Sequence, residues 1–140
     1  MKEQRGSMNI ALKSVAVLLA ALFFVSGGAK IGGWLDAQFE AWGYSPGFAV
    51  LLGIFEVVFA IALLIDRAAT WGAFGLMIIL LGAVGTHLLH GQYTLALLPI
   101  AVFGLLGFVA WGRGPQRHSV RAAPVEPAEQ RARRGVPSRV

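Results

Sequence analysis

The chain has 140 residues, of which 56% are hydrophobic and 14% are charged, and its mean hydropathy is +0.67. Ordinary soluble domains carry about 25% charged residues, so this composition excludes a typical soluble domain and indicates a protein that lies in lipid. The net charge of +5 belongs to residues 112–140, because residues 1–111 carry equal numbers of acidic and basic side chains. The pI of 10.5 is therefore weak support for nucleic-acid binding, and we expect no nucleic-acid partner.

Four apolar stretches are long enough to cross a bilayer core of about 30 Å, which takes about 20 helical residues. They lie near residues 10–29, 47–65, 70–89 and 93–111. The sequence therefore predicts an all-α, integral membrane four-helix bundle of up-down-up-down topology. Residues 1–9 precede this bundle, and residues 112–140 form a basic tail after it.

The first stretch follows the basic residues Lys2 and Arg5 and could pass for a signal peptide. Its apolar run is too long for a signal peptide and three more spans follow, so we interpret it as a retained helix. Phe23, Gly27 and Lys30 are spaced so that they share one face of this helix. Lys30 falls at the outer end of the stretch.

Residues 31–46, IGGWLDAQFEAWGYSP, connect the first two stretches and interleave aromatic with acidic side chains. This pattern is typical of an amphipathic segment that lies at the membrane interface. We predict that the segment covers a binding site as a lid, with Trp34 and Trp42 as its contact residues. An ordinary interfacial turn is the alternative.

Glu56 lies inside the apolar segment GIFEVVFAIALLI, residues 53–65, ten residues after Pro46. Ten helical residues correspond to a depth of ~15 Å, where a charged side chain costs about 2.5–3.5 kcal/mol on insertion scales. Burial there favours the neutral acid unless a cation or water compensates. We interpret Glu56 as an inward-facing functional residue. We predict that Glu56→Gln leaves folding and thermal stability near wild type but abolishes ligand binding or activity. The alternative is a protonated glutamate that only links two helices, in which case Glu56→Gln and Glu56→Leu would behave alike in function and differ only in stability.

His87 lies near the end of the third stretch, ~25 Å from its start. The expected depths form a descending series, with Lys30 at the outer boundary, His87 slightly below it and Glu56 near the middle. We therefore predict a polar vestibule that opens outward, in which Glu56 shares a proton with His87 or pairs through water with Lys30. Direct contact between Lys30 and Glu56 is left open, because their Cα atoms differ by ~15 Å in depth. Each residue also has a plainer interpretation, Lys30 as an interfacial side chain and His87 as a helix-end residue.

Basic residues gather on one side of the predicted bundle. They are Lys2, Arg5, Lys13, Arg67 and the arginines of the tail. The other side has only Lys30, which is balanced by two acidic residues in the segment that follows it. The positive-inside rule then places both termini in the cytoplasm. The tail is rich in Arg, Pro and Ala, and we expect it to be disordered.

Several short motifs follow one another along residues 10–111. They are Phe23-x-x-x-Gly27-x-x-Lys30, Trp42-Gly43, Pro46, Gly53-x-x-Glu56 and His87 late in the third helix. In this order and spacing they resemble the DoxX family of small four-helix bacterial membrane proteins, which implies a multi-pass protein of the bacterial cytoplasmic membrane. Many relatives carry an arginine seven residues before the phenylalanine. Ala16 stands there in this chain, so any role of that arginine is in doubt here.

The DoxX family is similar to a membrane subunit of thiosulfate:quinone oxidoreductase. The resemblance implies that a quinone or another amphiphile binds near Lys30, Glu56 and His87 as part of a membrane redox system, with a partner protein or further copies of the chain. The alternative is a non-enzymatic accessory subunit or a small-molecule carrier, and no catalytic residue is assigned.

Other chemistries have little support in the sequence. The absence of cysteine excludes thiol–disulfide chemistry by this chain, and no C-x-x-C-H motif for haem is present. A metal held by His87, His90 and Glu56 would need ligands at very different depths, so we expect no metal and no cofactor built into the chain.

Overall fold

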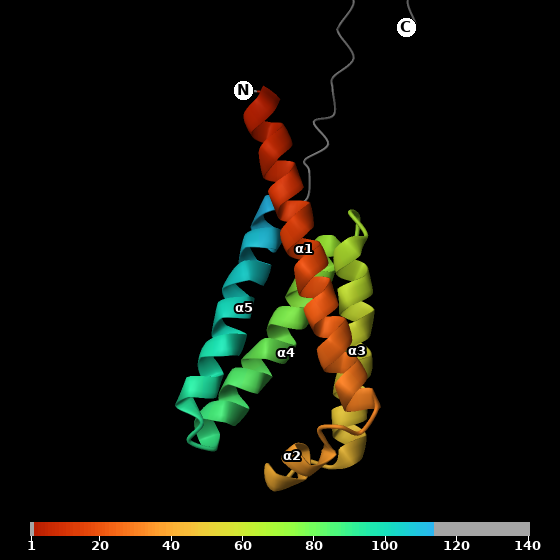
Figure 1. Ribbon diagram of the computed structural model, residues 1–140, viewed down its shortest axis with the longest axis vertical. Helices are drawn as coiled ribbons and strands as arrows, with labels where there is room; N and C mark the ends of the chain where they lie inside the picture. Colours follow the sequence, from red (N-terminus) through yellow and green to blue (C-terminus); the bar gives the residue numbers. More distant parts are fainter. Residues whose placement is uncertain (1, 114–140) are drawn as a thin grey trace, which may run out of the picture.

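The computed structural model describes residues 2–113, and from residue 114 onward the expected basic tail lies outside the described residues. The described chain forms five helices with turns between them and contains no strand. The helices are α1 Lys2–Ile31, α2 Asp36–Ala41, α3 Pro46–Leu64, α4 Ala69–Leu89 and α5 Tyr93–Gly112 (Figure 1). All except α2 are long and apolar enough to cross a membrane. The predicted all-α bundle of four membrane-spanning helices is therefore confirmed.

Local sequence signals set the helix ends. α3 begins where the Ser45 hydroxyl accepts a hydrogen bond from the Phe48 N–H and Pro46 takes the first helical position, which needs no N–H donor. The turn between α4 and α5 depends on Gly91, whose φ of 70° lies in the left-handed region that glycine tolerates best. α1 begins at Lys2 instead of near residue 10, because the polar residues before its apolar stretch continue the helix.

Glycines let the helices approach closely at two crossings. Between α1 and α3, a Cβ atom on Gly27 would lie 2.7 Å from the carbonyl oxygen of Gly53, and one on Gly53 would lie 2.6 Å from that of Gly27. Between α3 and α4, a Cβ atom on Gly72 would lie 2.6 Å from the backbone nitrogen of Leu63. In lipid, small residues at such crossings allow van der Waals contact between backbones, which is the main attraction between the helices.

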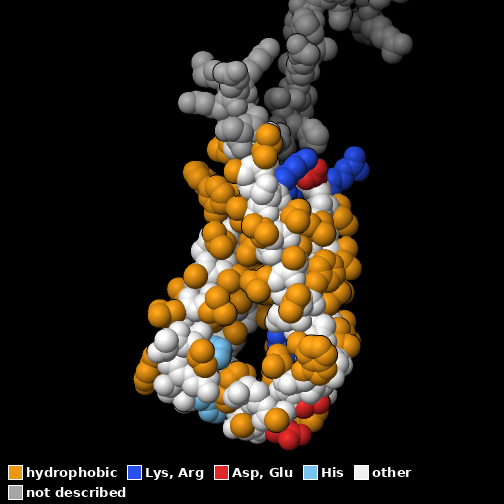
Figure 2. Space-filling view, viewed as in Figure 1, with side chains coloured by type: hydrophobic (Ala, Val, Ile, Leu, Met, Phe, Trp, Pro, Cys, Tyr) orange, Lys and Arg blue, Asp and Glu red, His pale blue; other side chains and the backbone are white. Residues whose placement is uncertain are grey.

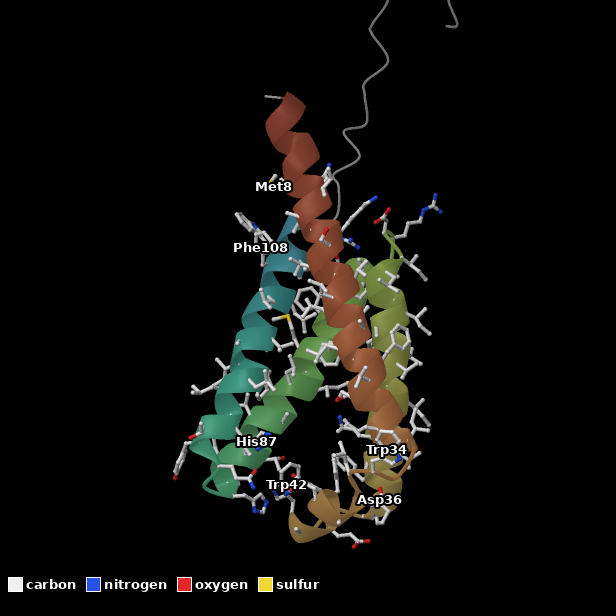
Figure 3. All side chains as sticks on the ribbon, viewed as in Figure 1. Met8, Trp34, Asp36, Trp42, His87 and Phe108 are labelled. Carbon is white, nitrogen blue, oxygen red and sulfur yellow. The ribbon has the colours of Figure 1, made fainter. Side chains whose placement is uncertain are left out.

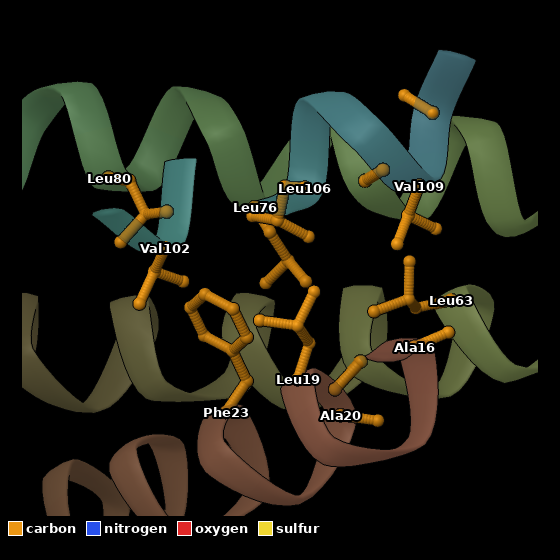
Figure 4. Packing of buried hydrophobic residues seen from close by; sticks show 13 residues of the cluster. Ala16, Leu19, Ala20, Phe23, Leu63, Leu76, Leu80, Val102, Leu106 and Val109 are labelled. Carbon is orange, nitrogen blue, oxygen red and sulfur yellow. The ribbon is translucent and has the colours of Figure 1, made fainter. Parts of the chain in front are cut away.

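The hydrophobic core lies toward the start of α1 and the end of α5, and Figure 4 shows how its side chains pack together. Its fully buried large side chains are Leu63, Leu76, Leu106 and Val109. Beyond this core, α1 and α3 separate from α4 and α5 toward the end that carries α2 (Figure 1). We call α1 with α3 the first arm of the bundle and α4 with α5 the second arm.

The outer surface of the long helices is apolar, and exposed hydrophobic side chains cover most of its height (Figure 2). Charged side chains lie toward the two ends. At the end near the termini, Asp66 forms ion pairs with Lys13 at 3.9 Å and with Arg113 at 3.7 Å. This distribution suits four helices whose sides contact the hydrocarbon of a bilayer.

Candidate functional site

A buried ion pair joins α1 to α3. The Lys30 ammonium group donates hydrogen bonds to both carboxylate oxygens of Glu56, at 3.0 and 2.9 Å, and to the Ser26 hydroxyl at 2.6 Å. Lys30 is 8% exposed and Glu56 is 4% exposed. The charge of Glu56 is therefore compensated by a cation in direct contact, which is how a carboxylate can be held inside an apolar bundle.

The expected 15 Å difference in depth between Lys30 and Glu56 is wrong. The estimate assumed that α1 ends and α3 begins at the same level of the membrane. In the structure the close Gly27–Gly53 crossing places Lys30 beside Gly53, because a Cβ atom on Gly53 would lie 2.9 Å from the Cβ atom of Lys30. α3 therefore starts well beyond the end of α1, and Glu56 is only one helical turn away from the level of Lys30.

The ion pair lies on the wall of a cavity of about 480 Å³ between the two arms. All five helices contribute side chains to the wall, which is mostly apolar. Its polar members include Ser26, Lys30, Tyr44, Glu56, Thr86 and His87. Figure 2 shows a hollow between the arms with a basic side chain on one edge and a histidine on the other.

His87 contributes to the same cavity from the second arm but does not contact Glu56. Its Nδ1 atom forms a 2.8 Å hydrogen bond with the side-chain oxygen of Gln92, just past the end of α4. Its ring meets Trp42 edge to face, with 5.3 Å between ring centroids (Figure 3). The expected sharing of a proton between His87 and Glu56 is therefore not seen, because His87 is paired within its own arm.

The segment around α2 spans the gap between the arms at the end away from the termini. Phe39 is buried against Tyr44 and Phe48, and Trp42 packs on His87 of α4 and on His90, the residue that follows α4. Trp42 lines the cavity, whereas Trp34 is 85% exposed and does not.

A hydrogen bond of 3.0 Å between the Tyr44 hydroxyl and the Thr86 hydroxyl ties this segment to α4. The vestibule that the sequence predicts as opening outward is thus covered at this end.

Four polar residues of the wall, Ser26, Gln38, Tyr44 and Thr86, were not predicted from the sequence. Ser26 lies one turn before Lys30 on the same helical face, so its spacing could have indicated it. Tyr44 and Thr86 are 42 residues apart and meet only because the bundle brings their segments together. No local pattern carries that information.

Among residues 8–113, whose side chains the structure describes, no three His, Asp or Glu residues are grouped so that they could hold a metal ion. The polar groups of the wall are instead an ammonium, a carboxylate, a carboxamide, hydroxyls and an imidazole beside aromatic and aliphatic surface. Such a wall suits a neutral organic molecule that has an apolar body and a few polar atoms.

Comparison with curated proteins and with solved structures gave no match. The model of one protein family, described as the DoxX-like family, matches residues 14–109. This range includes most of α1, all of α2, α3 and α4, and most of α5, and it contains both partners of the ion pair and His87. The chain is a multi-pass membrane protein that belongs to the DoxX-like family.

Proposed function

We propose that this membrane protein binds a neutral, ring-bearing amphiphile of the quinone class in the cavity between its two arms. The observation that carries the proposal is the buried Lys30–Glu56 ion pair on the wall of a mostly apolar cavity. Ligand sites in proteins combine apolar walls with a few convergent polar groups, and the cavity of about 480 Å³ lies within their usual range of roughly 300–1,000 Å³.

The charge of the site favours a neutral ligand. Lys30 and Glu56 already balance each other at 2.9 Å, so a charged ligand would bring an uncompensated charge into a cavity surrounded by apolar side chains. The aromatic rings of Phe23, Phe39 and Trp42 line the same space. They offer flat apolar surface on which a planar ring can pack.

The cavity has a side that faces lipid. Leu22 of α1 and Leu98 of α5 both line it, yet they are 43% and 68% exposed on the apolar outer surface. Closer to the termini the same two helices are in contact, because a Cβ atom on Gly112 would lie 2.6 Å from Leu12. A ligand dissolved in the bilayer would therefore reach the cavity between α1 and α5, while α2 covers the end that faces water.

The proposed role within a redox system is to bind and hold the ligand. The chain has no cysteine, and the groups on the cavity wall are not electron carriers. A partner protein or its cofactor would supply the electrons. This protein would fix the ring against the ion pair and exclude water.

Two measurements test the proposal. Gentle purification followed by lipid extraction and mass spectrometry should recover a quinone in near-stoichiometric amount. In nanodiscs, a variant that retains Trp42 alone should show saturable fluorescence quenching by a benzoquinone with a decyl chain, because Trp42 lines the cavity. A matched variant that retains only Trp111, which is exposed on the outside of α5, should show non-saturable quenching.

The outcome also separates this proposal from an accessory role. If no quinone copurifies and the two single-tryptophan variants respond alike, the cavity does not bind this class of ligand. The protein would then act as an accessory subunit that packs against a neighbour in the membrane, or as a carrier for other molecules.

A further inference from the structure

We infer that the cavity prefers the reduced, hydroxyl-bearing form of its ring ligand, the hydroquinone, over the oxidised quinone. The inference rests on the proposed function and adds the redox state of the ligand to it. Its basis is the number of donors and acceptors on the cavity wall that are not already used in hydrogen bonds within the protein.

The strongest donor on the wall is fully used. A lysine ammonium group has three N–H donors. Those of Lys30 point to three acceptors within 3.0 Å, the Ser26 hydroxyl and the two oxygens of Glu56. A quinone carbonyl can only accept a hydrogen bond, so it would have to displace one of these contacts to reach Lys30.

Two groups on the wall can accept a further hydrogen bond from a ligand but cannot donate one to it. The Glu56 carboxylate has about four lone-pair positions, and Lys30 uses one on each oxygen. His87 donates from Nδ1 to the Gln92 oxygen, which leaves Nε2 of the neutral ring without a proton and able to accept. Both groups can therefore receive a hydrogen bond from a ligand hydroxyl.

The other polar groups of the wall do not reverse this preference. The hydroxyls of Ser26, Tyr44 and Thr86 and the carboxamide of Gln38 can either donate or accept, so they serve both redox forms. Among the described side chains, the Trp42 indole N–H is a donor without a partner, but its nitrogen is buried. A quinone thus finds only groups that serve either redox form, whereas a hydroquinone also finds a carboxylate and an imidazole.

The test compares three ligands of one shape in nanodiscs under anaerobic conditions by isothermal titration calorimetry. They are a decyl-substituted benzoquinone, its hydroquinone and the dimethyl ether of that hydroquinone. The hydroquinone should bind about tenfold or more tightly than either of the others, a ratio equivalent to ~1.4 kcal/mol. Equal or tighter binding of the quinone would overturn the inference and leave the proposed function standing. Absence of binding by all three would overturn both.

A substitution at Ser26 tests the hydrogen-bond argument itself. Ser26→Ala removes one acceptor from Lys30 and so frees an N–H for a ligand carbonyl. Quinone affinity should rise severalfold, and the preference for hydroquinone should shrink. Ser26→Thr keeps the hydroxyl and should behave as wild type. If Ser26→Ala leaves the ratio of the two affinities unchanged, the occupied N–H groups of Lys30 do not explain weaker quinone binding in the wild type. The inference then fails.

Discussion

Removal of one partner of the Lys30–Glu56 pair should destabilise the bundle strongly, and removal of both should not. Each residue is less than a tenth exposed, and no other acidic or basic side chain lies on the cavity wall except His87, whose Nδ1 atom is paired with Gln92. Glu56→Gln would leave the Lys30 charge buried with an amide and a hydroxyl. Breaking a buried pair in this way costs about 3–5 kcal/mol of unfolding free energy.

This expectation differs from the one drawn from the sequence, where Glu56→Gln should leave folding intact. That prediction treated Glu56 as a neutral acid whose shape the amide reproduces. The structure instead shows a carboxylate in direct contact with a cation. The double variant with Lys30→Met and Glu56→Leu should lie near wild type or above it, because apolar side chains of similar size can replace a buried pair at little cost.

Equilibrium unfolding in mixed micelles, followed by circular dichroism, measures the single variants Lys30→Met and Glu56→Leu and the double variant that combines them. The losses of unfolding free energy in the two single variants should sum to several kcal/mol more than the loss in the double variant. Lys13→Met and Asp66→Asn form the matched control, since that pair lies 3.9 Å apart with side chains 66% and 72% exposed. The control variants should each change stability by less than about 1 kcal/mol. Strictly additive effects at Lys30 and Glu56 would refute the reasoning.

Three further predictions concern the helix crossing, the orientation and the α2 segment. Gly27→Ala should lower the melting temperature and weaken quinone binding, because its Cβ atom would meet the Gly53 backbone, whereas Gly28→Ala has free space and should do neither. An impermeant maleimide applied to intact cells should label a cysteine at Glu40 and fail to label one at Ser138; the reverse pattern would invert the orientation. Hydrogen exchange in residues 34–42 should slow when a ligand occupies the cavity, and equal exchange with and without ligand would show that this segment is not a lid.

The spans could be predicted from the sequence because hydropathy and length are local properties. Lipid requires long apolar helices, and the four stretches satisfy this requirement independently of how they pack. Gly27 and Gly53 were noted from the sequence only as members of short motifs, and their contact across a helix crossing was not predicted. The pairing of Gly27 with Gly53 depends on how α1 and α3 slide past each other, and residue composition does not specify that offset.

The main residues of the candidate site could be predicted from the sequence, but their contacts could not. Lys30, Glu56 and His87 were identified from their polarity in apolar surroundings, and the structure places all three on one cavity wall. Their contacts were not predicted, because depth was measured from the ends of each helix separately. The covering of the cavity by α2 depends on the contact between Tyr44 and Thr86, which joins distant parts of the chain.

The division of polar groups between the arms has a mechanical consequence. Both partners of the ion pair belong to the first arm, and His87 belongs to the second. Where the arms spread apart, the described contacts that join them include the Tyr44–Thr86 hydrogen bond and the packing of Trp42. A ligand that touches both Glu56 and His87 would link the two arms at the end where they spread apart, while the hydrophobic core holds them together at the other end. The width of a bound ring, more than its affinity for either arm, would then determine how far ligand binding restricts the motion of the two arms relative to each other.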